Sequence, residues 1–167
     1  MRRFLLIVIS VLGTVALVAT SAFADSPHFI SEGTASINSA GSYVVTDFKE
    51  AGLGNTTTKE AITLSATATA TYACINGGGK HPSAANKETK TTPVTNTNSF
   101  SVNNGQTTGT IKVGPPSAGG FSCPRGQKLV FTFVSYTSVE LIGLAGDTSP
   151  EPELSACLRP DVPGVCP

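Results

Sequence analysis

The chain has 167 residues, of which 40% are hydrophobic and 13% are charged, and its formal net charge at pH 7 is zero. This length fits one domain of ordinary size, and the scattered, balanced charge excludes the strongly basic surface that nucleic-acid binding requires. Tryptophan is absent and tyrosine occurs three times. The composition therefore disfavours a secreted module that stacks sugars on a platform of aromatic rings.

Residues 1–24 are predicted to form a secretory signal peptide. Arg2 and Arg3 precede an apolar run over 4–18 and a small-residue site at Ala22-Phe23-Ala24. The apolar run is shorter than the roughly 20 residues that a helix needs to cross a bilayer. We therefore expect a secreted, extracellular protein without a transmembrane segment after cleavage, with nine basic and eleven acidic residues remaining. An oxidising compartment favours disulfides.

Alternation of apolar and polar residues predicts strands along most of the chain. The weaker patterns cover 33–38, 42–48, 94–102 and 106–113. The clearest pattern runs from Ile62 to Cys74, with mostly alanine on one face and threonine or serine on the other. Large residues of the segment 128–142 are expected to pack against this alanine face. A slip in their alternation predicts either a bulge near Ser135 or two strands joined by a tight bend. Asn103-Asn104-Gly105 predicts a hairpin turn.

About six or seven short strands without a convincing helix predict an all-β fold, namely a small antiparallel β-sandwich of the immunoglobulin-like kind. We assign this sandwich to residues 25–146. Residues 147–167 contain five prolines and are expected to form an extended, disulfide-closed tail.

Four cysteines allow three pairings. Position in the predicted strands favours Cys74 with Cys123, and closeness in sequence favours Cys157 with Cys166. The chain has no Cys-x-x-Cys spacing, and its histidines are far from any cysteine cluster. We expect no metal site and no cofactor.

The segment 75–92 follows the longest predicted strand and is hypothesised to be a recognition loop. Three consecutive glycines before a lysine are similar to a phosphate-binding loop, but the second Gly-Lys-Ser/Thr element and the following helix are missing. We expect a non-catalytic binding or structural module whose partner is an extracellular protein or an envelope component. The hypothetical binding residues are Asn76, Gly78, Lys80, His81 and Lys87.

Two alternative functions stay open. The loop between Cys157 and Cys166 could act as a protease inhibitor with Arg159 as its specificity residue. His81 could serve a hydrolase as a base, although no nucleophile elbow surrounds any serine. The absence of such motifs favours a protein that is not an enzyme.

Three segments together resemble a group of small, secreted actinobacterial proteins of unknown function. They are Phe48 to Gly54, Cys74 to Pro82 with Ala85-Asn86-Lys87, and Pro115 to Gly119 with Cys123-Pro124. The resemblance covers roughly residues 33–144 and implies an exported single domain. It assigns no catalytic or binding residue.

Overall fold

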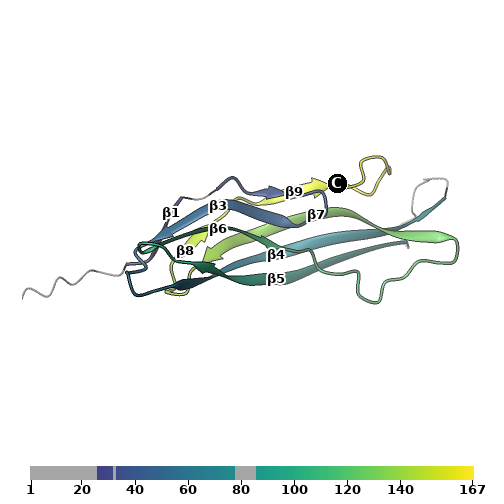
Figure 1. Cartoon of the computed structure of the whole chain (residues 1–167). Helices are drawn as coiled ribbons and strands as arrows, with labels where there is room; N and C mark the ends of the chain where they lie inside the picture. Colours follow the sequence, from purple (N-terminus) through teal and green to yellow (C-terminus); the bar gives the residue numbers. More distant parts are fainter. Residues whose placement is uncertain (1–25, 32, 78–85) are drawn as a thin grey trace, which may run out of the picture.

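A computed structural model describes residues 26–31, 33–77 and 86–167, and it shows two antiparallel sheets packed face to face as a small β-sandwich (Figure 1). The all-β prediction is confirmed. The predicted signal peptide lies outside the described residues. Sheet A consists of β1 (His28–Ser31), β2 (Ser36–Ile37), β3 (Tyr43–Ala51) and β6 (Gln106–Val113). Sheet B consists of β4 (Lys59–Asn76), β5 (Lys87–Ser101), β7 (Gln127–Ile142), β8 (Thr148–Pro150) and β9 (Leu154–Cys157).

The main core lies between the two sheets. Sheet A contributes large side chains such as Tyr43 and Ile111, and these share one buried cluster with Ala66 and Ala68 of β4. The prediction that the segment 128–142 packs against the alanine face is wrong, because this segment is β7, which is hydrogen-bonded to β4 within the same sheet. The large residues that pack against the alanines of β4 therefore come from strands of sheet A, on the other side of the sandwich.

The bulge in β7 lies close to the predicted position. Ser135 itself pairs regularly with Thr69, and the register shifts three residues later at Ser138, which has a φ of 50°. A second shift lies opposite the step from Thr71 to Tyr72. There the extra residue in β7 re-aims the side chains that follow.

The predicted turn at Asn103-Asn104-Gly105 forms, with positive φ values of 51° and 70° at its last two residues. Only the bridge between Asn103 and Gln106 closes it, because β5 then joins β4 in sheet B and β6 joins β3 in sheet A. The turn therefore connects the two sheets of the sandwich.

Sheet B is much longer than sheet A, since β4 has 18 residues and β7 has 16, while β3 has 9. Sheet A therefore covers only one end of sheet B (Figure 1). We call this the proximal end, where β4 begins at Lys59, and we call the opposite end, where β4 finishes at Asn76, the distal end. In the ranges 26–31, 33–77 and 86–167 no helix is long and apolar enough to span a membrane.

The distal end is stabilised by disulfides and by the C-terminal segment. Cys74 bonds Cys123, and Cys157 bonds Cys166, as predicted. Strands β8 and β9 pair with β7, so the proline-rich segment adds edge strands to sheet B. A second buried cluster joins Ala73 of β4 to Val162 and Val165 of that segment. Ala73 belongs to the threonine face of β4, so the C-terminal residues cover this end of sheet B on the face opposite to sheet A.

Candidate functional site

A groove of about 320 Å³ opens at the distal end. Three segments that are distant in the sequence form its walls, namely the end of β4, the turn before β7 and the residues after β9. Its lining residues are Ile75, Asn76, Gly77, Gly126, Lys128 and Arg159. The groove therefore exists only because the C-terminal segment folds back onto sheet B.

The walls of the groove are held by regular pairing and by burial. Asn76 pairs with Gln127, and Ile75 pairs with Lys128, in the ladder between β4 and β7. On the third wall, Leu158 N donates to Thr132 O at 2.8 Å, which fixes the backbone next to Arg159. A site on such a rigid base loses little conformational entropy when it binds a ligand.

Arg159 is oriented by a nearby acid. Its Nε donates to Oδ1 of Asp161 at 2.8 Å, and its Nη2 donates to Oδ2 at 2.6 Å. This pairing raises the pKa of the Arg159 guanidinium and lowers the pKa of the Asp161 carboxyl. A guanidinium has five N–H donors. Three therefore remain for water or a ligand.

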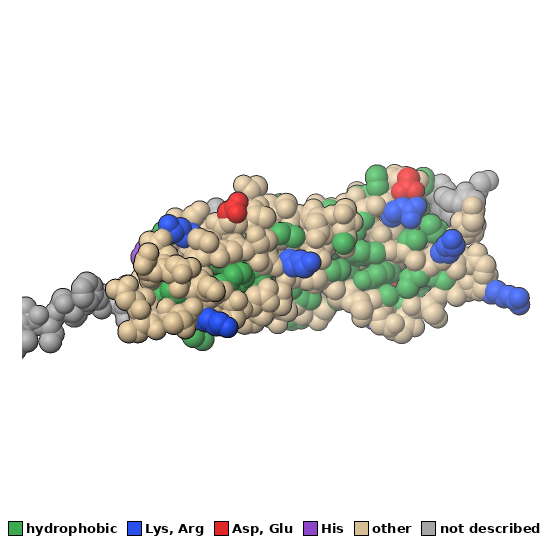
Figure 2. Space-filling view, in the orientation of Figure 1, with side chains coloured by type: hydrophobic (Ala, Val, Ile, Leu, Met, Phe, Trp, Pro, Cys, Tyr) green, Lys and Arg blue, Asp and Glu red, His purple; other side chains and the backbone are tan. Residues whose placement is uncertain are grey.

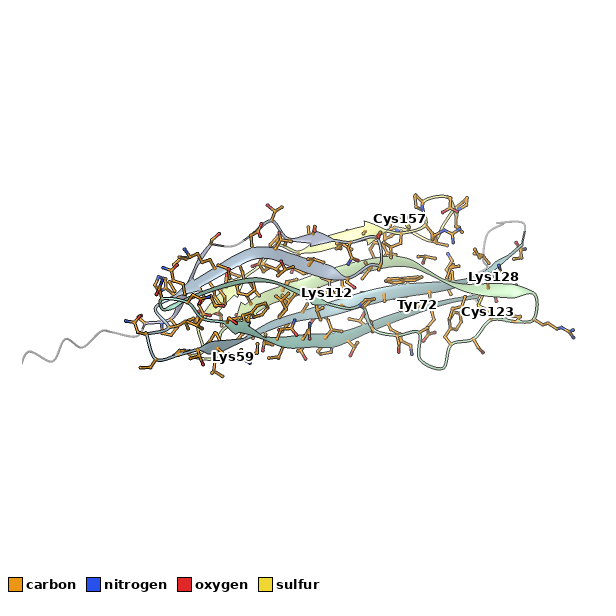
Figure 3. The ribbon with its side chains drawn as sticks, viewed as in Figure 1. Lys59, Tyr72, Lys112, Cys123, Lys128 and Cys157 are labelled. Atoms are coloured by element: carbon orange, nitrogen blue, oxygen red, sulfur yellow. A yellow bond between two sulfur atoms is a disulfide. The ribbon has the colours of Figure 1, made fainter. Side chains whose placement is uncertain are left out.

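Lys128 and Arg125 are exposed, and among the described residues neither forms an ion pair. Figure 3 places Lys128 toward the distal end of the ribbon, far from Lys59 at the proximal end. Arg125 precedes Gly126, which lines the groove. Both cations are free to meet an anionic partner.

Basic residues are concentrated in the distal half of the sandwich. Five of the eight lysines and arginines within the described ranges lie on strands or loops of that half; they are Lys87, Lys90, Arg125, Lys128 and Arg159. Figure 2 shows several Lys and Arg side chains gathered at the right-hand end of the visible face, with an acidic side chain beside them. Most of the basic residues within the described ranges therefore lie in the distal half, and two of them line the groove.

Two of the five hypothetical binding residues can be placed. Asn76 lines the groove, whereas Lys87 donates a hydrogen bond to the carbonyl of Gly164 and so secures the C-terminal segment. Gly78, Lys80 and His81 lie outside the described residues. The structure thus brings Asn76 to the groove and places Lys87 on its supporting side.

Sequence reasoning missed Lys128 as a groove residue and considered Arg159 only for protease inhibition. Lys128 is the second residue of β7, which otherwise consists mostly of apolar and hydroxyl residues. A lone cation near the end of such a strand is a signal that could have identified it. No pattern in the sequence brings Arg159 next to it, because their proximity depends on the fold of the C-terminal segment.

The loop between Cys157 and Cys166 packs against sheet B. Val162 and Val165 are buried, at 3% and 4% exposure, and Arg159 is engaged by Asp161. The apolar side of this loop is therefore anchored on sheet B, while Pro160 stays exposed. The inhibitor hypothesis and the His81 hydrolase hypothesis remain predictions.

The face of sheet B that points away from sheet A carries rows of threonines, whereas the groove is lined by cations. Threonine hydroxyls of β4 and β5 meet across the strands, with Oγ1–Oγ1 distances of 2.8 Å for Thr63–Thr97 and 3.1 Å for Thr71–Thr89. These cross-strand pairs satisfy one another's hydrogen bonds. These threonine pairs carry no charge, in contrast to the cations that line the groove.

In the part of the chain that the structure describes, no group of three or more His, Cys, Asp or Glu residues has an arrangement suited to a metal ion. The chain matches no protein-family model, and the searches of curated proteins and of solved structures likewise found no match.

Proposed function

We propose that this protein is a secreted, non-catalytic binding module that holds an anionic extracellular protein or envelope component in its distal groove. The observation that carries the proposal is the convergence of Lys128 and Arg159 on one groove at the cation-rich end of the sandwich. Carboxylate or phosphate groups are the ligands that such side chains recognise.

The chemistry of the two cations is complementary. Lys128 offers a mobile point charge, whereas Arg159 offers donors whose direction is set by Asp161. The neighbouring amide of Asn76 adds a group that can donate and accept. This combination suits a ligand with several anionic oxygens better than one isolated charge.

The two disulfides fit an extracellular protein. Secretion by means of residues 1–24 is part of the proposal. Export would place the groove in contact with acidic polymers and proteins outside the cell.

The test is retention of the purified secreted form on immobilised polyphosphate and on immobilised poly-glutamate, with neutral dextran as the reference matrix. Lys128→Gln should elute at lower salt than the parent protein, because a cation in contact with the bound polyanion contributes far more than one separated from it by more than a Debye length. The matched control is Lys112→Gln, an exposed lysine on β6 away from the groove. Equal elution of parent, Lys128→Gln and Lys112→Gln would contradict the groove as the binding site.

A second experiment separates the groove from the segment 78–85. The parent, Lys128→Gln and a variant lacking residues 78–85 are each incubated with the producing cell's envelope and secreted fractions. Loss of one retained partner in Lys128→Gln supports the groove, whereas loss only in the deletion variant supports the recognition-loop hypothesis instead. Retention by none of the three, the parent included, counts against a partner from the producing cell.

A further inference from the structure

The proximal end contains a carboxyl group that has no counterion. Glu50, on β3, has 0% exposure, and as an ionised group neither of its carboxylate oxygens has a hydrogen-bond donor. A buried carboxylate without a donor is strongly unfavourable compared with the same group in water. Its environment should therefore favour the protonated form.

Asp147 approaches the same position from the other sheet. It ends the loop 143–147 that connects β7 to β8, and both of its carboxylate oxygens are buried without a donor. Two backbone bonds shape this loop, from Gly143 N to Asp147 O at 2.9 Å and from Gly146 N to Gly143 O at 3.1 Å. The loop therefore holds the Asp147 side chain in a defined position.

The two carboxyl groups converge beside Gly143. The point that a Cβ atom would occupy on Gly143 lies 2.2 Å from Asp147 Oδ1 and 2.7 Å from Glu50 Oε1. Both oxygens crowd the same point, so the side chains of Glu50 and Asp147 lie next to each other. Two carboxylates have no proton to form a hydrogen bond with each other. One carboxyl and one carboxylate do form it, and a single proton then gives one oxygen of each group a hydrogen-bond partner.

The charged groups around Glu50 all oppose its ionisation. Burial, the charge of Asp147 and the charge of Glu60 raise the pKa of Glu50 to about 8. Glu60, at the start of β4, is 3% exposed, and its Oε1 accepts a hydrogen bond from Leu144 N at 2.7 Å. No basic side chain contributes to the effect on Glu50 within the described residues. The pair thus lies among acids only, contributed by β3, β4 and the loop 143–147.

We propose that Glu50 and Asp147 share one proton, and that this carboxyl pair is a pH-sensitive clasp that fastens the loop 143–147 of sheet B to β3 of sheet A. At acidic and neutral pH the proton is present and the clasp is closed. In mildly alkaline solution the proton leaves, two buried negative charges face each other, and the proximal end of the sandwich loosens.

The direction of the pH dependence follows from proton binding. The folded protein holds the proton up to about pH 8, whereas an unfolded glutamate releases it near its ordinary pKa of about 4.3. Between these values the folded state binds more protons than the unfolded state, so stability falls as the pH rises. The contribution is fully present below the unfolded pKa and is lost through the folded pKa. The folding equilibrium constant should fall by up to about tenfold per pH unit in this window.

The experiment measures urea unfolding of the parent, Glu50→Gln and Asp147→Asn from pH 5 to pH 9. We expect the parent to lose stability across this range, and both variants to show a much flatter profile and to exceed the parent at pH 9. A glutamine at 50 can donate to the Asp147 carboxylate without needing the proton. The matched control is Asp47→Asn, an exposed acid on the same strand, which should retain the parent's slope. Equal slopes in all four proteins would overturn the proposal.

A second measurement covers the case in which a variant does not fold. Infrared spectra of the parent protein should show a protonated-carboxyl C=O band at pH 7 that disappears by pH 9.5, and an absent band overturns the shared proton. Unfolding is also repeated with EDTA and with added Ca²⁺. If Ca²⁺ stabilises the parent and removes its pH slope, a bound cation takes the place of the proton and the clasp as proposed is wrong.

Discussion

The two ends of this sandwich treat charge in opposite ways. At the proximal end both sheets are present, and together they bury Glu50 and most of Glu60 away from water. At the distal end sheet A is missing, the C-terminal segment packs on the other face of sheet B, and Lys128 and Arg159 line an open groove. We expect carboxyl groups enclosed between the two sheets to gain or lose a proton with pH, and cations beside a single sheet to be accessible to a binding partner. The length difference between the sheets produces this contrast.

The largest effect on stability is expected from removing the Cys74–Cys123 disulfide at the distal end. Replacing both Cys74 and Cys123 by serine should lower the free energy of unfolding by about 4 kcal/mol, because the bond closes a loop with a sequence separation of 49. Urea denaturation of the oxidised proteins measures this change. The corresponding double variant at Cys157 and Cys166 closes a separation of only 9 and should lose less. An unchanged midpoint in the first variant would contradict a distal end that depends on its disulfide.

The next effect tests the crowded carboxyl pair at the proximal end. Gly143→Ala places a methyl group 2.2 Å from Asp147 Oδ1 and 2.7 Å from Glu50 Oε1, so one of the carboxyl groups must move. We expect a loss of about 1–3 kcal/mol in the free energy of unfolding at pH 6. Gly114→Ala is the matched control, since a Cβ at that position has no neighbour within 4 Å. Equal losses in both variants would show that the space beside Gly143 is not restricted.

A smaller effect is expected from the cluster beneath the C-terminal segment. Val162→Ala removes two methyl groups from a contact with Ala73 and should reduce stability by about 1–2 kcal/mol. It should also lower the salt concentration needed for elution from polyphosphate, because the segment positions Arg159. Chemical denaturation and chromatography are run on the same sample. If Val162→Ala is less stable but is retained on the matrix as strongly as the parent, the packing of the C-terminal segment is not needed for binding.

The smallest effect on stability is expected at the rim of the groove. Asp161→Asn breaks an exposed ion pair with Arg159 and should leave the thermal midpoint unchanged. It removes a negative charge from the groove, so retention on polyphosphate should increase, opposite in sign to Lys128→Gln. Weaker retention would mean that Asp161 is needed to orient the guanidinium rather than competing with the ligand for it.

The local pattern of residues was sufficient for much of the fold. Alternation predicted β4, the Asn103-Asn104-Gly105 turn follows from residues that tolerate positive φ, and both disulfide pairings were inferred correctly from position. Each of these features depends on neighbours in the sequence or on strand ends. The bulge was predicted three residues away from Ser138 because several positions in that segment disturb the alternation similarly.

The alternation of residues along the sequence does not reveal which strand belongs to which sheet. Strands β5 and β6 follow one another through a tight turn and look like a hairpin, yet they belong to different sheets. The ring of Phe100 explains part of this, because it lies over Gly109, where a Cβ would come within 2.3 Å of it. Such packing joins residues from facing sheets, and no periodicity along one strand encodes it.

By itself, the sequence determined that this chain forms strands, where the main turn falls and which cysteines pair, because these properties arise from side-chain alternation, backbone preference and proximity along the chain. Only the tertiary structure decided that Glu50 meets Asp147 and that Lys128 meets Arg159 around one groove. Glu50 and Asp147 are about a hundred residues apart in the sequence, and Lys128 and Arg159 are about thirty residues apart. The physical reason is that sheet A ends before sheet B does. The sandwich therefore encloses Glu50 and Asp147 at one end and leaves Lys128 and Arg159 open to solvent at the other.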